Sequence, residues 1–157
     1  MGKLEDLSKR IDDGREQGDQ IMETADEKID DAENFKSALD SIEIVDEDTQ
    51  DILNEGTDGA SEVATEQGEQ IVSQMEGVSE QLSEVSSEAD ESAETEHGNA
   101  EKISDAPGDY SSVASQAESR FEEQAANYEG VRDESQEIND EFKDRADDAK
   151  NQLESFF

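Results

Sequence analysis

Apolar and small side chains recur alternately three and four residues apart along most of this chain, and this heptad spacing strongly restricts its possible folds. Residues at that spacing share one face of an α-helix and form a seam that packs against another helix. The first seam predicts a helix over about 3–45. Its members are Leu4, Leu7, Ile11, Gly14, Gly18, Ile21, Ala25, Lys28, Ala32, Phe35, Leu39 and Ile42.

A second seam predicts a helix over about 49–97. We assign its amino terminus to Asp48 or Thr49, because either side chain can accept hydrogen bonds from free backbone N–H groups. Two successive four-residue steps in this seam, from Ala60 to Gly68, predict a local relaxation of the supercoil. The seam comprises Leu53, Gly56, Ala60, Ala64, Gly68, Ile71, Met75, Val78, Leu82, Val85 and Ala89.

The end of this second helix is assigned to His97 and Gly98. A histidine cation in a last turn suits the helix dipole, and glycine readily adopts the left-handed conformation that closes a helix. A connector over 98–108 follows, in which Pro107 and Gly108 impose a bend.

A third seam predicts a helix over about 109–157, with Asp109 as its amino-terminal cap. Most of the aromatic residues fall on this stripe, so burial energy is expected to concentrate there. The seam runs through Tyr110, Ala114, Ala117, Phe121, Gln124, Tyr128, Val131, Ser135, Ile138, Phe142, Ala146, Ala149, Leu153 and Phe156.

The three segments match in length and short connectors join them, which favours antiparallel neighbours. We therefore predict an all-α fold, an elongated antiparallel three-helix bundle or coiled coil of long helices, with residues 1–157 as a single helical domain. Glycines interrupt the predicted helices at Gly14, Gly18, Gly56, Gly68 and Gly77. Each costs about 1 kcal/mol relative to alanine. We interpret them as points where helices approach closely, with deliberate weak points in the helices as the alternative.

The net charge of −35, from 47 acidic and 12 basic residues, opposes any compact state. Molar salt relieves such repulsion, because the screening length falls to roughly 3 Å at 1 M. The acidity therefore favours an organism with a high-salt cytoplasm. An alternative interpretation is nucleic-acid mimicry, in which rows of carboxylates copy phosphate spacing and occupy a basic groove. Direct nucleic-acid binding is not expected, since the chain has no basic stripe.

No residue pattern in the sequence predicts catalysis. Serines are numerous, but none is accompanied by a nucleophile elbow or a partnered histidine. The single histidine, His97, is interpreted as a capping residue. The acidic run from Asp46 fails the calcium-loop pattern, because the sixth position is Asp51 instead of glycine. With no cysteine and no phosphate-binding loop, we expect no enzyme, no cofactor and no metal site.

The sequence has no signal-peptide core and no membrane-spanning run, and its longest apolar cluster, Ile42 to Val45, is far too short to cross a bilayer. Acidic faces also repel anionic headgroups. A cytoplasmic or virion-associated location without membrane contact is therefore expected.

Two local resemblances bear on function. Tyr128, Glu129 and Gly130 loosely resemble the aromatic-x-glycine turn of small helical-hairpin proteins secreted by the type VII system. The triplet lies within a continuous seam, and no tyrosine-based export signal follows it. The polar heptads of the middle segment are similar to chemoreceptor signalling helices, although no membrane segment accompanies them. Neither resemblance assigns a family; the first implies a secreted helical partner protein.

The leading hypothesis is a non-catalytic structural or assembly protein that scaffolds or joins components of a larger complex, such as a virion or secretion apparatus, in a high-salt organism. It would act through protein partners or self-association along its seams. The alternatives are a type VII-like secreted partner and an acidic nucleic-acid mimic. Phe157 lies beyond the third seam and is predicted to offer an apolar plug. The predicted interaction residues are Leu7, Ile11, Phe35, Leu39, Ile71, Val78, Leu82, Phe121, Tyr128, Ile138, Phe142, Leu153, Phe156 and Phe157.

Overall fold

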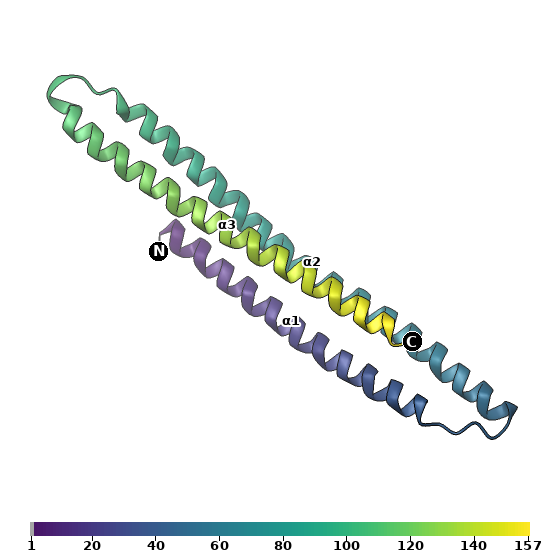
Figure 1. Ribbon diagram of the computed structural model, residues 1–157. Helices are drawn as coiled ribbons and strands as arrows, with labels where there is room; N and C mark the ends of the chain where they lie inside the picture. Colours follow the sequence, from purple (N-terminus) through teal and green to yellow (C-terminus); the bar gives the residue numbers. More distant parts are fainter. Residues whose placement is uncertain (1) are drawn as a thin grey trace. The chain divides into compact units, whose positions relative to one another are not determined.

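The computed structural model describes residues 2–157 and is all-α. Its helices are α1 (Lys3–Asp40), α2 (Glu47–Ser104) and α3 (Ser111–Ser155), with a 3₁₀ turn, η1 (Gly108–Tyr110), directly before α3 (Figure 1). No strand occurs within residues 2–157. The helices pack against one another, which confirms the predicted all-α three-helix bundle.

Two compact units make up the bundle, and each contains a segment of all three helices. Unit 1 comprises residues 2–15 and Glu80–Asn139, and unit 2 comprises Glu16–Ser79 and Asp140–Phe157. Each unit therefore buries its own set of apolar side chains from α1, α2 and α3.

In unit 1, α2 and α3 run antiparallel. Ser83 of α2 pairs with Asn139 of α3. Asp90, which lies further along α2, pairs with Arg132, which lies earlier in α3. Full burial of a side chain such as leucine or valine stabilises the fold by about 1.5–3 kcal/mol. The buried apolar residues of this unit are Leu7, Ile11, Leu82, Val85, Ala89, Ala93, Ala100, Ala114, Ala125, Val131 and Ile138.

A buried polar layer joins α2 and α3 in unit 1. The Ser135 hydroxyl donates a 2.6 Å hydrogen bond to the carbonyl of Leu82, and Asn139 Nδ2 donates to Ser83 Oγ at 3.2 Å. Asn139 Oδ1 is buried and accepts no hydrogen bond from the described residues. Sliding one helix along the other would leave further polar groups unpaired at a cost of about 1–3 kcal/mol each, so this layer specifies the register of the pair.

In unit 2, α1 and α3 run parallel. Gly18 lies against the ring of Phe142, and further along both helices Phe35 lies against Phe157, with ring centroids 6.3 Å apart. The buried apolar residues of this unit are Met22, Ala25, Ile29, Ala32, Leu39, Ala64, Ile71, Met75, Val78, Phe142, Ala146, Ala149 and Leu153.

The glycines of the helices mark close helix contacts at three of the five predicted positions. A Cβ atom built on Gly14, Gly18 or Gly68 would lie 2.9 Å or less from a side chain of another helix. At Gly56 the corresponding distance, 3.4 Å, is an ordinary contact, and at Gly77 nothing lies within 4 Å. The prediction of close helix approach is therefore confirmed at Gly14, Gly18 and Gly68 and wrong at Gly77.

The first helix ends five residues earlier than the predicted boundary near residue 45. α1 ends at Asp40, where the Ser41 hydroxyl donates a 2.8 Å hydrogen bond to the carbonyl three residues earlier. The β-branched residues that follow, including Ile42 and Val45, favour extended backbone over helix. Ile42 therefore lies in the loop and not on the first seam.

The second helix begins at Glu47, so the assignment of its cap to Asp48 or Thr49 is wrong. The capping side chain is Asp46, whose Oδ1 accepts hydrogen bonds from the Thr49 backbone N–H at 2.8 Å and the Thr49 hydroxyl at 2.9 Å. The hydrogen bond from the Thr49 backbone has the largest effect on the pKa of the Asp46 carboxyl, followed by that from the Thr49 hydroxyl, and both lower it.

The predicted end of this helix at His97 and Gly98 is also wrong, as is the connector over 98–108. α2 continues through Gly98 to Ser104, and the left-handed glycine is Gly108, with φ of 60°. Burial of Ala100 in the core offsets the roughly 1 kcal/mol that a glycine costs inside a helix.

The start of the third helix differs from the prediction in one respect. Asp109 lies inside η1, and α3 begins at Ser111, so Asp109 does not cap α3. The chain turns between α2 and α3 at Pro107 and Gly108, and Gly108 has a positive φ.

Candidate interaction surfaces

The seam side chains predicted to carry the function occupy different environments. Those that are buried are Leu7, Ile11, Leu39, Ile71, Val78, Leu82, Ile138, Phe142 and Leu153. Those that are partly exposed are Phe121, Tyr128, Phe156 and Phe157. Phe35 is 46% exposed and stands at the surface instead of inside the first seam. Buried side chains act by holding the bundle together, so candidate contact surfaces are found among the exposed apolar residues.

A groove of about 480 Å³ lies between α1 and α2 in unit 2. Most of the residues that line it are apolar or small. The lining includes Ala32 and Phe35 from α1, Gly59, Ala60 and Val63 from α2, and Phe157, which follows α3.

The α2 side of this groove continues a heptad stripe that starts at Ile52, a residue outside the lining, and of which the predicted second seam includes only Gly56. Ile52, Gly56, Gly59 and Val63 are spaced four, three and four residues apart and so share one face of α2. Ile52 is 66% exposed and Val63 is 52% exposed. The signal was present in the sequence, since this stripe runs one residue before the seam positions Leu53 and Ala60.

The loop between α1 and α2 adds further exposed apolar side chains to unit 2. Ile42, Ile44 and Val45 all lie in this loop, and Val45 is the most exposed of them at 78%. Large apolar side chains grouped on a surface are typical of sites that contact another molecule. Unit 2 therefore exposes apolar side chains in this loop, on the α2 stripe and at the groove, which we call together the apolar surface of unit 2.

Three phenylalanines form a small cluster at the groove. The Phe157 ring lies 6.3 Å from the ring of Phe35 and 6.3 Å from that of Phe156, in tilted arrangements favoured by aromatic pairs. Phe157, predicted to be an exposed plug, is partly buried by these contacts. It closes one side of the groove in unit 2.

The charge around the groove is negative. Asp31 and Glu55 belong to its lining, and no lysine or arginine occurs between Lys36 and Lys102. Unit 2 carries 26 acidic and 5 basic side chains, whereas unit 1 carries 21 and 7. A ligand of this groove therefore meets apolar walls edged by carboxylates.

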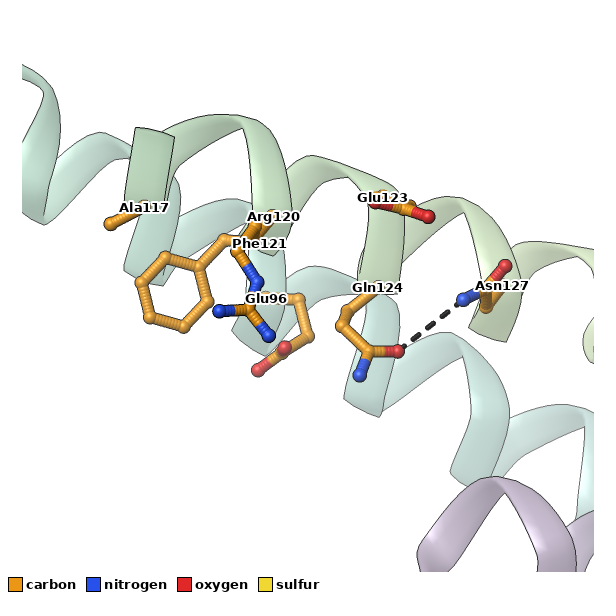
Figure 2. Close-up of a pocket in the computed structure, with 7 residues that line it drawn as sticks. All are labelled: Glu96, Ala117, Arg120, Phe121, Glu123, Gln124 and Asn127. Atoms are coloured by element: carbon orange, nitrogen blue, oxygen red, sulfur yellow. Dashed lines mark hydrogen bonds between the residues drawn. The ribbon is translucent and has the colours of Figure 1, made fainter. Parts of the chain in front are cut away.

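A second hollow, of about 440 Å³, lies in unit 1 between α2 and α3 (Figure 2). Its lining mixes charges of both signs, with Glu96 from α2 and Arg120 and Glu123 from α3, around the side chain of Phe121. Gln124 and Asn127, the polar residues at its α3 side, share a 3.4 Å hydrogen bond. This mixed lining is less suited than the groove in unit 2 to an apolar ligand.

His97 forms a charged link between α2 and α3 in unit 1. Its Nδ1 lies 2.8 Å from Glu122 Oε2, and its Nε2 lies 2.6 Å from Glu129 Oε1. Ionised carboxylates only accept hydrogen bonds, and both ring nitrogens donate only in the imidazolium, so this arrangement favours the protonated ring. The hydrogen bond to Glu129, followed by that to Glu122, raises the pKa of His97. The predicted capping role of His97 is therefore wrong.

A second cation links the same two helices. Arg132 Nη1 lies 2.8 Å from Asp90 of α2, and its Nε lies 3.0 Å from the neighbouring Asp133. These contacts, with the hydrogen bond to Asp90 as the largest, raise the pKa of Arg132. Unit 1 thus places several of its cations between helices, where they offset the repulsion of the surrounding carboxylates.

Within residues 2–157, no group of three or more His, Cys, Asp or Glu side chains is arranged to hold a metal ion. None of the helices that the structure describes has an apolar stretch sufficient to span a bilayer.

Tyr128, Glu129 and Gly130 lie inside α3, so the chain makes no turn at this triplet. Comparison of the chain with protein families, curated proteins and solved structures produced no match.

Proposed function

We propose that this chain is a non-catalytic structural or assembly protein, an acidic helical bundle that joins protein components of a larger complex such as a virion or secretion apparatus. The observation that carries this proposal is the apolar surface of unit 2. Six of its large apolar side chains are exposed: Phe35, Ile42, Ile44, Val45, Ile52 and Val63. In a chain with so few apolar residues, leaving these uncovered forgoes burial of about 25 cal/mol per Å².

The physical role of such a surface is contact with another protein. Apolar patches bordered by polar residues are typical of protein interfaces, and carboxylates surround this one. The acidic excess keeps the bundle itself soluble while the patch remains available.

We further propose that the protein works at high salt. A net charge of −35 is opposed by few ion pairs between helices, and in unit 2 the cross-helix pair is Arg145 with Asp19, 3.7 Å apart. Screening by molar salt would replace the missing counter-charges.

A photo-crosslinking amino acid at Ile52 tests the assembly role in the organism that makes this protein. The control position is Thr65, an exposed residue of α2 that lies outside the stripe of Ile52, Gly56, Gly59 and Val63. The expected result is a crosslink from position 52 to a small, constant set of proteins that belong to one assembly. Equal or absent crosslinking from the two positions would contradict the proposal.

A second candidate is the acidic nucleic-acid mimic. It is favoured by the acidic stretch between Lys36 and Lys102, which contains no lysine or arginine. A mimic would bind a basic DNA-binding protein, and duplex DNA would displace it from that protein. The assembly role predicts instead that duplex DNA leaves the Ile52 crosslinks unchanged.

A further inference from the structure

We propose that the groove of unit 2 binds an amphipathic helix of a partner protein whose apolar face is flanked by lysine and arginine. This inference rests on the proposed assembly function and names the chemical class of the partner.

The shape of the groove suits a helix. Its two walls belong to helices, α1 and α2, and its lining includes Gly56, Gly59 and Ala60, which let a third backbone approach closely. A Cβ built on Gly59 would have nothing within 4 Å, so the space above this residue is open. Helices commonly dock into such grooves through side chains at positions i, i+3, i+4 and i+7.

The heptad stripe on α2 supplies the matching periodicity. The stripe has a large side chain at each end, Ile52 and Val63, and two glycines between them, so that the side chains of a docked helix fit over the glycines. In unit 2 the third helix, α3, ends at Ser155, and Phe157 lies against Phe35. The stripe around Ile52 is consequently exposed, and the buried residues of α2 begin only at Ala64.

Charge selects the class of helix. Asp31 and Glu55 belong to the lining, and the adjacent loop and helix start carry Asp46, Glu47 and Asp48. A second copy of this chain brings a net charge of −35 to a surface of the same sign, which opposes self-association. A helix with basic flanks places cations against these carboxylates instead.

The same arrangement can operate at molar salt. Screening then limits attraction to charges within roughly 3 Å, so the basic flanks must lie directly against the carboxylates of the groove. Kosmotropic salts strengthen apolar burial, and the apolar face of the helix supplies that contact.

Binding of two synthetic helical peptides, each about three heptads long, tests the inference. Both carry the same leucine and alanine face; one has lysine and the other glutamate at the flanking positions. Fluorescence anisotropy with the full chain should detect the lysine peptide, with the glutamate peptide at least about tenfold weaker, equivalent to about 1.4 kcal/mol. Equal binding of the two peptides would overturn the basic class of partner, and absence of any binding would overturn the docking site.

A matched pair of glycine substitutions locates the binding site. Gly59 and Gly77 both lie exposed on α2 with nothing within 4 Å of a built Cβ, but only Gly59 lines the groove. Gly59→Gln should weaken the lysine peptide about tenfold or more and Gly77→Gln should leave it unchanged, with circular dichroism showing equal helicity. Equal effects of the two substitutions would place the peptide outside the groove and overturn the inference.

Sedimentation of the chain alone identifies the competing occupant. A dimer that Gly59→Gln dissociates and Gly77→Gln does not would make a second copy the ligand and overturn the inference; a monomer supports it. These outcomes are separable from the crosslinking test. Specific crosslinks from Ile52 combined with failed peptide binding reject the basic helix and keep the assembly role, whereas absent crosslinks reject the assembly role itself.

Discussion

Units 1 and 2 use the same heptad spacing but are stabilised in different ways. Unit 1 has cross-helix links through Arg10, Arg15, His97 and Arg132, together with the buried hydrogen bond from Ser135. Its exposed large apolar residues are Tyr110 and Val113.

Unit 2 depends on apolar and aromatic contact, as between Gly18 and Phe142, and exposes six large apolar side chains. Unit 2 also has the larger acidic excess. It carries 26 acidic and 5 basic side chains, whereas unit 1 carries 21 acidic and 7 basic ones. Polar links therefore specify helix register in unit 1, whereas unit 2 has fewer such links and leaves more apolar surface uncovered.

The largest expected effect comes from a cavity in either core. Leu82 in unit 1 and Leu153 in unit 2 are both fully buried, and substitution of each by alanine should lower the free energy of unfolding by about 2–5 kcal/mol. Native-state hydrogen exchange should show lost protection mainly in the unit that carries the substitution. The exposed Ser87→Ala is the control. A uniform loss across both units would show that they unfold as one.

Replacement of glycine by alanine should have opposite effects on stability at Gly18, which contacts Phe142, and at Gly77, which has open space beside it. A Cβ on Gly18 would lie 2.5 Å from Phe142 Cζ, so Gly18→Ala should destabilise the protein by about 1–3 kcal/mol. Gly77→Ala meets no neighbour and should stabilise it by up to about 1 kcal/mol through helix propensity. Thermal unfolding of both variants measures the difference, and the same sign of change in both would contradict this packing.

Salt should stabilise unit 2 more than unit 1, because unit 2 has the greater acidic excess. Between about 0.1 M and 1 M salt the screening length falls from about 10 Å to about 3 Å. We expect the melting temperature to rise by more than about 4 °C, which corresponds to about 1 kcal/mol. Hydrogen exchange across the series should show the larger gain in unit 2. High helicity that does not depend on salt would reject the high-salt proposal.

The smallest expected effect is a pH dependence confined to unit 1. The pKa of His97 is raised in the folded protein by Glu129 and Glu122. Stabilisation by this link is therefore fully present below about pH 6.5, the value for an unfolded histidine, and is lost as the pH rises through the raised pKa. The hydrogen-exchange protection factors of residues 97–104, which are corrected for the intrinsic rise of exchange with pH, should fall over that rise. His97→Gln should abolish the change, and its persistence in that variant would assign it to another group.

Spacing predicted the helices and much of the core. Leu7, Ile11 and Leu82 were assigned to seams because of their spacing, and each is buried. The helix ends were less predictable. Asp46 and Asp48 can both accept capping hydrogen bonds, and only the backbone course shows that Thr49 donates to Asp46. Gly98 has the propensity of a helix end, but burial of the neighbouring Ala100 keeps the helix intact.

Only part of the candidate interaction surface could be predicted from the sequence. Phe35 and Phe157 were both predicted to take part, but as a seam residue and an exposed plug, whereas they form one aromatic contact at the groove. Ile52 was missed because it lies on a second stripe beside the seam. A pattern of spacing identifies which side chains share a helix face, but it does not show whether another helix covers that face.

The sequence by itself determined that this chain forms three helices with apolar seams and an acidic surface, because side-chain periodicity and charge are local properties of each segment. The tertiary structure alone decided which seam positions are covered, which cations reach across to another helix, and where the groove of unit 2 stays open. Those features depend on where each helix ends and which residues of its neighbours lie beside it, and both follow from packing between distant segments.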